Sequence, residues 1–467
     1  MPKISIALIF GFLLWAYFGI YQLPYYVWTF ALTQNWFTDN GLILFKDIIY
    51  HHTQLPLFAL FGMSKILGNT PDMMRASSFI LLIVFSFGIL LLGRKISKKV
   101  GNISFAIFLL TFFTLFHNFH IEEMMASLFC IYATFFYLKF WDKLSSWWIF
   151  FSGIFVSLGI MSKQSVGLII LVFLLASVWQ IRRNKKLVKT TIKGFMYFFL
   201  GLLIAATPFF FYYFVNHSLG DFFYWNIIFN FTIYPKQSIP YALKDGMIAA
   251  GWLLFSIIPS IYLLFTKLIN KELRFPLILL TLCAVFLSTS LLPSFLTYKA
   301  LPFYPYPLII WGILLVNIDK RILKIFIVTG LLLLLPAIKS FYVDYLPTDA
   351  FNNRFILDYG DSELKIVDWL KKNTIYKEKI MNLGHHYVTT LARRLPQNRY
   401  VYLFPWLVSP FDVSTKEILK NPPKTVVVDW RTFDDFPVLH KWQFIDYVKT
   451  NYKLVAKYDS YEIFSNK

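Results

Sequence analysis

Carboxylates are scarce in the first 339 residues of this chain, so the few that occur there are the first candidates for chemistry. That stretch holds ten of the 25 Asp and Glu residues. An ionisable side chain near a bilayer is costly, and it is usually functional or paired. Seven of these acids fall on one side of the apolar segments described below: Asp39, Asp47, Asp72, Glu122, Glu123, Asp221 and Asp245.

Two of these acids lie in the first long polar stretch of the chain. Asp39 could serve as a base for a hydroxyl group, but Asp is also a good helix N-cap, and Gly41 permits the turn that a cap needs. Asp47 and His51 are four residues apart, with His52 next, so a helix would place them on one face as half of a metal site. A solvated helix at the membrane interface is the simpler alternative for them.

Glu122 and Glu123 form a second acidic group, in a predicted turn between two apolar spans. Adjacent carboxylates repel each other, which makes the pair a candidate for chemistry. An ordinary solvated loop explains it equally well. His117 and His120 flank the pair and could be metal ligands, although polar surface residues are the simpler interpretation.

Four basic residues on the same side could bind an anion. Together they could hold a lipid-linked phosphate at the outer leaflet. Each of them alone is more simply an interfacial anchor whose charge reaches water. They are Arg75, Lys163, Lys236 and Lys299.

Long apolar segments must position these residues. The chain is 57% hydrophobic and 15% charged, whereas a soluble domain has about 25% charged residues. A membrane helix needs about 20 mostly apolar residues. The first apolar run, at the N-terminus, resembles a signal peptide but has no small-residue cleavage site, so we interpret it as an uncleaved helix. The predicted spans are 4–22, 74–93, 103–118, 124–140, 147–162, 165–181, 194–215, 247–266, 275–292, 302–317 and 322–339.

The placement of positive charge predicts the orientation. Residues 1–339 carry 27 of the 45 Lys and Arg residues, and with the N-terminus inside, 19 of these lie in cytosolic segments and 8 outside. This is the bias of the positive-inside rule, and it explains the net charge of +20 without a nucleic-acid partner. We therefore expect a multi-pass protein of the plasma (inner) membrane.

The outer side has long loops and a terminal domain. In the loop 23–73, the stretch Gly41–Tyr50 is predicted to be an amphipathic helix in the interface. After residue 340 polar residues return, and strands alternate with helices, which is typical of a small α/β domain. The expected strands are Lys379–Leu383, Arg399–Phe404, Thr425–Asp429, Lys453–Tyr458 and Tyr461–Phe464, with helices at Ser362–Lys372 and Ser414–Lys420.

The expected fold is therefore mainly α: a polytopic membrane protein of about eleven transmembrane helices with a small extracytoplasmic α/β domain. Residues 1–339 would form the membrane domain and 340–467 the outer domain. Cys130 and Cys283 both lie in apolar spans, which argues against a disulfide framework.

Several motifs, in their order along the chain, resemble GT-C glycosyltransferases. The likeness is to the branch that contains dolichyl-phosphate-mannose–protein mannosyltransferases and the bacterial aminoarabinose transferase that modifies lipid A. The matching segments are Phe37–Gly41, Lys46–Ile48, Gln54–Phe58, Arg75–Ser77, Glu122–Glu123, Gly159–Lys163 and Tyr298–Pro305. Many members have Asp-Glu where this chain has Asp39-Asn40, so the second carboxylate is replaced here by an amide.

The resemblance implies transfer of a sugar, with inversion, from a polyprenyl-phosphate donor to an outer protein, glycolipid or polysaccharide acceptor. It implies Asp39 as general base, and Lys163 and Lys299 at the leaving phosphate, with Arg75 and Lys236 behind them. The remaining implied site residues, which would orient a substrate or help to bind a divalent metal ion, are Asp47, Glu122, Glu123 and Tyr298.

Two other classes of protein fit part of the sequence. A transporter or flippase of polyprenyl-linked sugars would also need many spans, but such proteins usually show internal repeats and broken helices at the midplane. An oligosaccharide polymerase or ligase would also have many spans and one large loop, but it would lack the acidic motif of the first loop.

Overall fold

The computed structural model describes residues 11–17, 19–20, 29–50, 52–115, 120–232, 243–266, 268–291, 297–319 and 360–466. Only residues 11–17 and 19–20 of the predicted span 4–22 are described, and the predicted span 322–339 lies outside the described residues.

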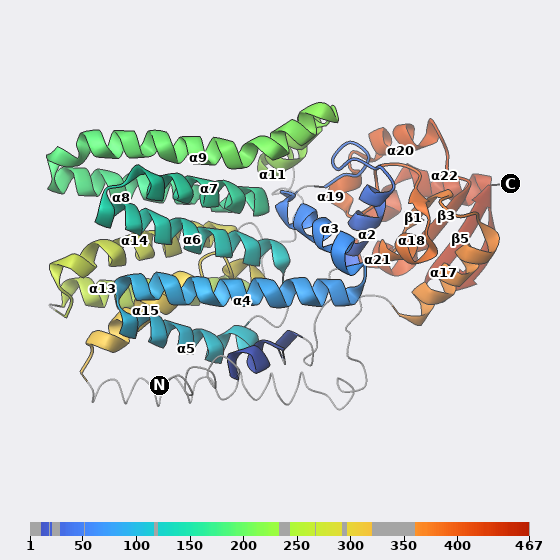
Figure 1. The fold of residues 1–467 in the computed structure, drawn as a ribbon. Helices are drawn as coiled ribbons and strands as arrows, with labels where there is room; N and C mark the ends of the chain where they lie inside the picture. Colours follow the sequence, from blue (N-terminus) through green and yellow to red (C-terminus); the bar gives the residue numbers. More distant parts are fainter. Residues whose placement is uncertain are drawn as a thin grey trace.

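The membrane part is a bundle of apolar helices (Figure 1). Five described segments are long and apolar enough to cross a membrane: Pro71–Ile96, Ile121–Lys143, Gln164–Arg183, Lys185–Val215 and Lys271–Leu291. The predicted spans from 74–93 to 302–317 each overlap a described helix, whereas the full count of eleven stays a prediction. The helices are α4 (Pro71–Ile96), α5 (Lys98–Leu115), α6 (Ile121–Lys143), α7 (Ser146–Ser162), α8 (Ile169–Arg183), α9 (Val188–Val215), α13 (Leu243–Phe265), α14 (Lys271–Leu287) and α15 (Pro305–Asn317).

Glycines let α7 and α9 approach very closely. A Cβ atom on Gly153 of α7 would overlap the backbone carbonyl of Phe198 on α9, and a Cβ atom on Gly201 of α9 would overlap the carbonyl of Phe150 on α7. Small residues at such a crossing replace side-chain volume with backbone contact, which is the usual way that membrane helices associate. The crossing fixes α7, at whose end Lys163 lies.

The two ends of the bundle differ in charge. At one end, Lys95 near the end of α4 forms an ion pair with Asp142 near the end of α6. The basic segments Arg94–Lys99 and Arg182–Lys193 span the ends of α4 and α8. The C-terminal domain lies at the opposite end, where α4 and α6 begin (Figure 1).

The C-terminal domain is a five-stranded sheet in the order β2-β1-β3-β5-β4, with β2, β1 and β3 parallel. Strands β1 (Lys379–Leu383) and β3 (Thr425–Asp429) confirm the predicted bounds, and the others are β2 (Leu395–Pro396), β4 (Tyr452–Tyr458) and β5 (Tyr461–Asn466). The helices of this domain are α17 (Asp361–Asn373), α18 (Tyr387–Ala392), α19 (Pro405–Val408), α20 (Phe411–Leu419), α21 (Trp430–Asp435) and α22 (Gln443–Asn451).

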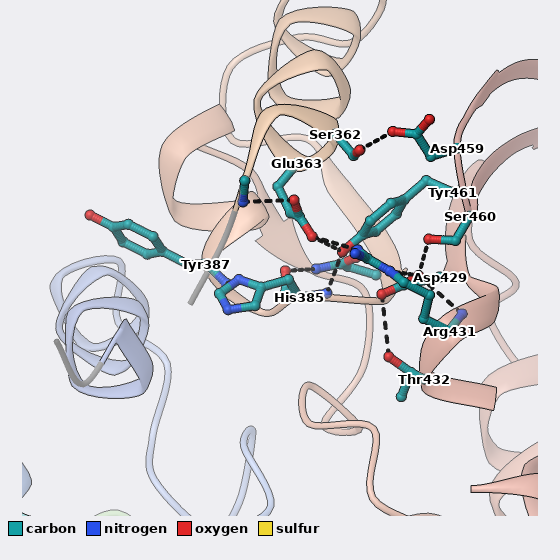
Figure 2. A network of polar contacts seen from close by, with 12 residues as sticks. Ser362, Glu363, His385, Tyr387, Asp429, Arg431, Thr432, Asp459, Ser460 and Tyr461 are labelled. Carbon is teal, nitrogen blue, oxygen red and sulfur yellow. Dashed lines mark hydrogen bonds and ion pairs between the residues drawn. The ribbon is translucent and has the colours of Figure 1, made fainter. Parts of the chain in front are cut away.

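A polar network joins α17 to the sheet (Figure 2). The guanidinium of Arg431 donates to Glu363 Oε1 at 2.8 Å and to Asp429 Oδ1 at 3.3 Å. Tyr461 donates to the same Glu363 oxygen at 2.9 Å, and Ser460 donates to Asp429 at 2.7 Å. Two buried carboxylates are thereby paired, as burial requires.

The predicted strand Arg399–Phe404 is wrong. These residues form no strand because their backbone groups are used elsewhere. The carbonyl of Arg399 accepts from Ile49 N at 3.1 Å, and Phe404 N donates to Tyr402 O at 3.0 Å. The segment packs against the first long loop of the membrane part instead of extending the sheet.

The first long loop holds α2 (Thr29–Asp39) and α3 (Leu55–Leu67), and the predicted helix Gly41–Tyr50 is absent between them. That stretch turns sharply: Phe45 has a φ of 70°, and Phe45 N donates to Ile48 O at 2.9 Å. The apolar side chains that suggested an amphipathic helix are buried instead, among them Phe45 and Ile48.

Candidate active site

Glu122 and Glu123 lie in the first turn of α6, and both are buried. The interpretation of these residues as a solvated loop is therefore wrong. The N-terminus of a helix carries a partial positive charge from its unpaired N–H groups, which favours carboxylates there. The helix start thus gives two acids a favourable place inside an otherwise apolar bundle.

Glu123 forms an ion pair with Lys163, which lies between α7 and the 3₁₀ turn η2 (Gln164–Leu168). The carboxylate side chain is 4% exposed and the lysine side chain 11%. The second carboxylate oxygen, Oε2, has no hydrogen-bond partner among the described residues. A buried acceptor of this kind is available to a bound hydroxyl or cation.

Lys299 brings a second buried ammonium group to the same place. It lies in the turn η6 (Thr297–Ala300), and the chain is held there because Ser127 of α6 donates to the carbonyl of Leu301 at 2.7 Å. Burial, together with the charge of Lys163, lowers the pKa of Lys299 to about 8. Two lysines that repel each other in a buried site would be stabilised by an anion.

Tyr50 and His120 complete this cluster. The Tyr50 hydroxyl donates to Glu122 Oε1. Burial, followed by the charge of Glu122, raises the pKa of Tyr50 well above its usual value, so Tyr50 remains a donor. His120 precedes α6, and burial lowers its pKa. We call these six residues the carboxylate–lysine cluster: Tyr50, His120, Glu122, Glu123, Lys163 and Lys299.

A group of three amides lies next to Lys163, and two of them, Gln54 and Asn226, are buried. Asn226 Oδ1 accepts from Gln164 Nε2 at 3.1 Å and from Gln54 Nε2 at 3.5 Å, and Tyr213 donates to Gln54. Asn226 lies on a π-helical turn, Tyr224–Ile228, a rare conformation that is frequent at functional sites. These contacts join residues from distant parts of the chain, so only the match of Gln54 to a family motif pointed to them.

Asp39 is the last residue of α2, so its interpretation as a helix N-cap is wrong. Gly41, with a φ of 82°, and Asn40 end the helix instead: Asn40 Nδ2 donates to the carbonyl of Trp36 at 2.8 Å. A carboxylate at a helix C-terminus is unfavourable, and Lys65 of α3 offsets this by pairing with Asp39. This pair is half open to water, with side chains 32% and 55% exposed.

The structure does not bring every predicted site residue into the carboxylate–lysine cluster. Asp47 has a local role, because its Oδ2 accepts from Ile43 N at 2.8 Å within the turning loop. Arg75 is buried on α4. Lys236 and the side chain of Tyr298 lie outside the described residues.

A metal centre needs several ligating side chains gathered in one place. Among the described residues, no group of three His, Cys, Asp or Glu side chains could hold a metal ion. Of the predicted pair of Asp47 and His51, His51 lies outside the described residues.

Comparison with known proteins gives a family match and a fold. The family described as dolichyl-phosphate-mannose-protein mannosyltransferase matches residues 51–216, which include Arg75, Glu122, Glu123 and Lys163. A search of curated proteins finds no match.

Three solved structures share the fold. ArnT from Cupriavidus metallidurans in the apo state is 13% identical, with a TM-score of 0.61 over 100% of this chain and 98% of ArnT. The same ArnT bound to undecaprenyl phosphate is 14% identical, with a TM-score of 0.60 over 100% and 99%. The Archaeoglobus fulgidus oligosaccharyltransferase in complex with Zn and sulfate is 13% identical, with a TM-score of 0.55 over 89% of this chain and 65% of that one. The resemblance found in the sequence is thereby confirmed.

Proposed function

Starting from this likeness to GT-C glycosyltransferases, we propose that the chain transfers a sugar from a polyprenyl-phosphate donor to an acceptor on the outer face of the membrane. The observation that carries the proposal is the buried Glu123–Lys163 ion pair with Lys299 beside it. The match to ArnT, which has been solved with undecaprenyl phosphate bound, supports the choice of donor.

The two lysines provide what the leaving group needs. As the bond between the sugar and the phosphate breaks, negative charge collects on the phosphate oxygens, and cations placed there beforehand stabilise the transition state. Lys163 and Lys299 would contact that phosphate. Glu122 and Glu123 would orient the sugar or the acceptor through hydrogen bonds, and the second oxygen of Glu123 has no hydrogen-bond partner among the described residues.

Asp39 is the proposed general base of an inverting single displacement. Its contact with Lys65 is the kind of exposed pair that contributes little to stability, so an acceptor hydroxyl can replace it at small cost. The base would then take the hydroxyl proton while the oxygen attacks the anomeric carbon and the phosphate leaves. The described contacts of Asp39 include none with the carboxylate–lysine cluster, so the sugar would have to bridge them.

The test is transfer of a labelled sugar from a polyprenyl-phosphate donor by the full chain in liposomes, with wild type compared with Asp39→Asn. The base hypothesis expects loss of at least about 100-fold in rate, with membrane insertion unchanged. Asp72→Asn is the matched control, because it makes the same change at an acid on the same side of the bundle that is not part of the proposed site. Asp72 lies in the first turn of α4. Equal rates for the wild type and Asp39→Asn would refute the base.

The orientation of the chain in the membrane can be tested separately from the reaction. We propose that the N-terminus is cytosolic and that the C-terminal domain is extracytoplasmic, because the basic segments lie at the other end of the bundle. A reporter fused after Lys467 should be active only outside the cytosol. Cytosolic activity of the reporter would overturn the orientation, and with it the outer-face reaction.

A further inference from the structure

We propose that the C-terminal domain is part of the reaction centre, because it holds Glu122 in place through a row of three aromatic rings. The rings belong to Tyr402 of the C-terminal domain and to Phe30 and Tyr50 of the first loop; we call them the aromatic row. This inference rests on the proposed function, since it names what positions one of its carboxylates.

The aromatic row is continuous from the domain to the carboxylate. The ring centroids of Tyr402 and Phe30 are 4.2 Å apart, and those of Phe30 and Tyr50 are 4.9 Å apart. The Tyr50 hydroxyl then donates to Glu122 Oε1. Tyr402 and Tyr50 are buried, and close-packed interiors leave little free space, so a shift of one ring displaces the next.

Contacts on either side of the aromatic row attach the first loop to the C-terminal domain. Ile49, next to Tyr50, donates its backbone N–H to the carbonyl of Arg399 at 3.1 Å. Thr29, next to Phe30, shares a hydrogen bond with His386 at 3.1 Å. Farther along α2, Trp36 Nε1 donates to the carbonyl of Arg394 at 2.9 Å. The loop that carries Tyr50 is therefore attached to the C-terminal domain at several points.

Tyr402 acts through its ring. Its hydroxyl is buried and has no hydrogen-bond partner within the part of the chain that is described, so removal of the oxygen breaks no contact there. Tyr50 acts through both parts: its ring packs on Phe30 and its hydroxyl holds Glu122. Tyr402, Phe30 and Tyr50 are thus positioning residues for Glu122, and the variants below separate ring from hydroxyl.

The experiment is a double-mutant cycle on transfer rates of the full chain in liposomes. Tyr50→Phe removes the hydroxyl, Tyr402→Leu removes the ring that supports it, and a third variant combines them. Each single change should lower kcat by about tenfold, as expected for a lost hydrogen bond to a charged group, with the KM for the donor changed little. The combined variant should be no slower than Tyr50→Phe, because both changes remove the same constraint.

Two controls separate positioning from general damage to the domain. Tyr402→Phe keeps the ring and should retain most of the rate. Tyr400→Leu removes a neighbouring buried tyrosine whose hydroxyl donates to Glu417 of α20 at 2.8 Å, within the domain, and it should leave kcat near the wild-type value. The inference is overturned if the losses of kcat caused by Tyr402→Leu and Tyr50→Phe multiply in the combined variant. It is also overturned if Tyr400→Leu is as slow as Tyr402→Leu.

A second readout does not depend on the reaction. Melting temperatures of the detergent-solubilised chain should show coupling between Tyr402→Leu and Glu122→Gln, although no contact joins these two residues directly in the described part of the chain. Changes at residues without a shared partner are normally additive. A wild-type chain that transfers no sugar would defeat the proposed function alone, since this coupling would still support the row. Strictly additive shifts in melting temperature would contradict the positioning role of the aromatic row, whether or not the chain transfers a sugar.

Discussion

Replacing Lys163 with Met should destabilise the folded protein far more than the same change at Lys65. Both lysines pair with a carboxylate, but the Lys163–Glu123 side chains are 11% and 4% exposed, whereas those of Lys65–Asp39 are 55% and 32% exposed. Removing one partner of a buried pair costs about 3–5 kcal/mol, because a charge is left without compensation. An exposed pair contributes about 0–1 kcal/mol.

The loss of folding free energy caused by Lys163→Met should fall near the lower end of that range. Lys299 interacts electrostatically with both Lys163 and Glu123, so it would partly neutralise the carboxylate left behind. We expect a loss of about 3 kcal/mol. The double variant Lys163→Met with Glu123→Gln should recover much of this loss, since no buried charge then remains unpaired.

The assay is unfolding of the purified full-length chain in detergent, followed for the wild type, Lys163→Met, Lys65→Met and the double variant. The expected order of stability places Lys163→Met lowest, with the double variant above it. Equal stability of Lys163→Met and Lys65→Met would show that the buried Glu123 carboxylate does not depend on Lys163, because it is solvated or has another partner.

Other predictions concern the anion site and the bundle. Affinity for undecaprenyl phosphate should fall as the pH rises through about 8, because Lys299 then loses its proton and the site loses positive charge. Lys299→Met should abolish this pH dependence, and an affinity of the wild type that does not change with pH would contradict the prediction. Gly153→Leu should lower the melting temperature sharply because the side chain meets the backbone of α9, whereas Gly251→Leu, with nothing within 4 Å of its Cβ position, should not. Treatment with a chelator should leave transfer unchanged if Lys163 and Lys299 alone meet the phosphate charge; loss of activity that a divalent ion restores would show otherwise.

Much of the helical architecture could be predicted from the sequence because each membrane helix is a continuous apolar run. Strands β1 and β3 could also be predicted from the sequence, since buried central strands consist of short β-branched and apolar segments bounded by polar residues. In contrast, the segments Gly41–Tyr50 and Arg399–Phe404 had the right periodicity for a helix and a strand, and they form neither. Each is the other's packing partner, as the bond from Ile49 N to Arg399 O shows, and local pattern carries no information on such a contact.

The candidate site was predicted in part. Glu123 and Lys163 were both identified, as acid and cation on the same side, and the structure pairs them. Tyr50 was missed because its partner Glu122 is 72 residues away and Tyr is common throughout this chain. Lys65 was missed because one lysine on an apolar helix is indistinguishable from an interfacial anchor.

Lys163 and Lys299 are proposed to bind the phosphate of a lipid carrier. The most direct measurement compares the affinity of the purified chain for undecaprenyl phosphate and for undecaprenol, which has the same tail and no phosphate. We predict that the wild type prefers the phosphate by about 10- to 100-fold, in line with one or two hydrogen bonds to a charged group, and that Lys299→Met loses most of this preference while its fold is retained. Equal affinity of the wild type for the two lipids would show that the two lysines do not bind the phosphate.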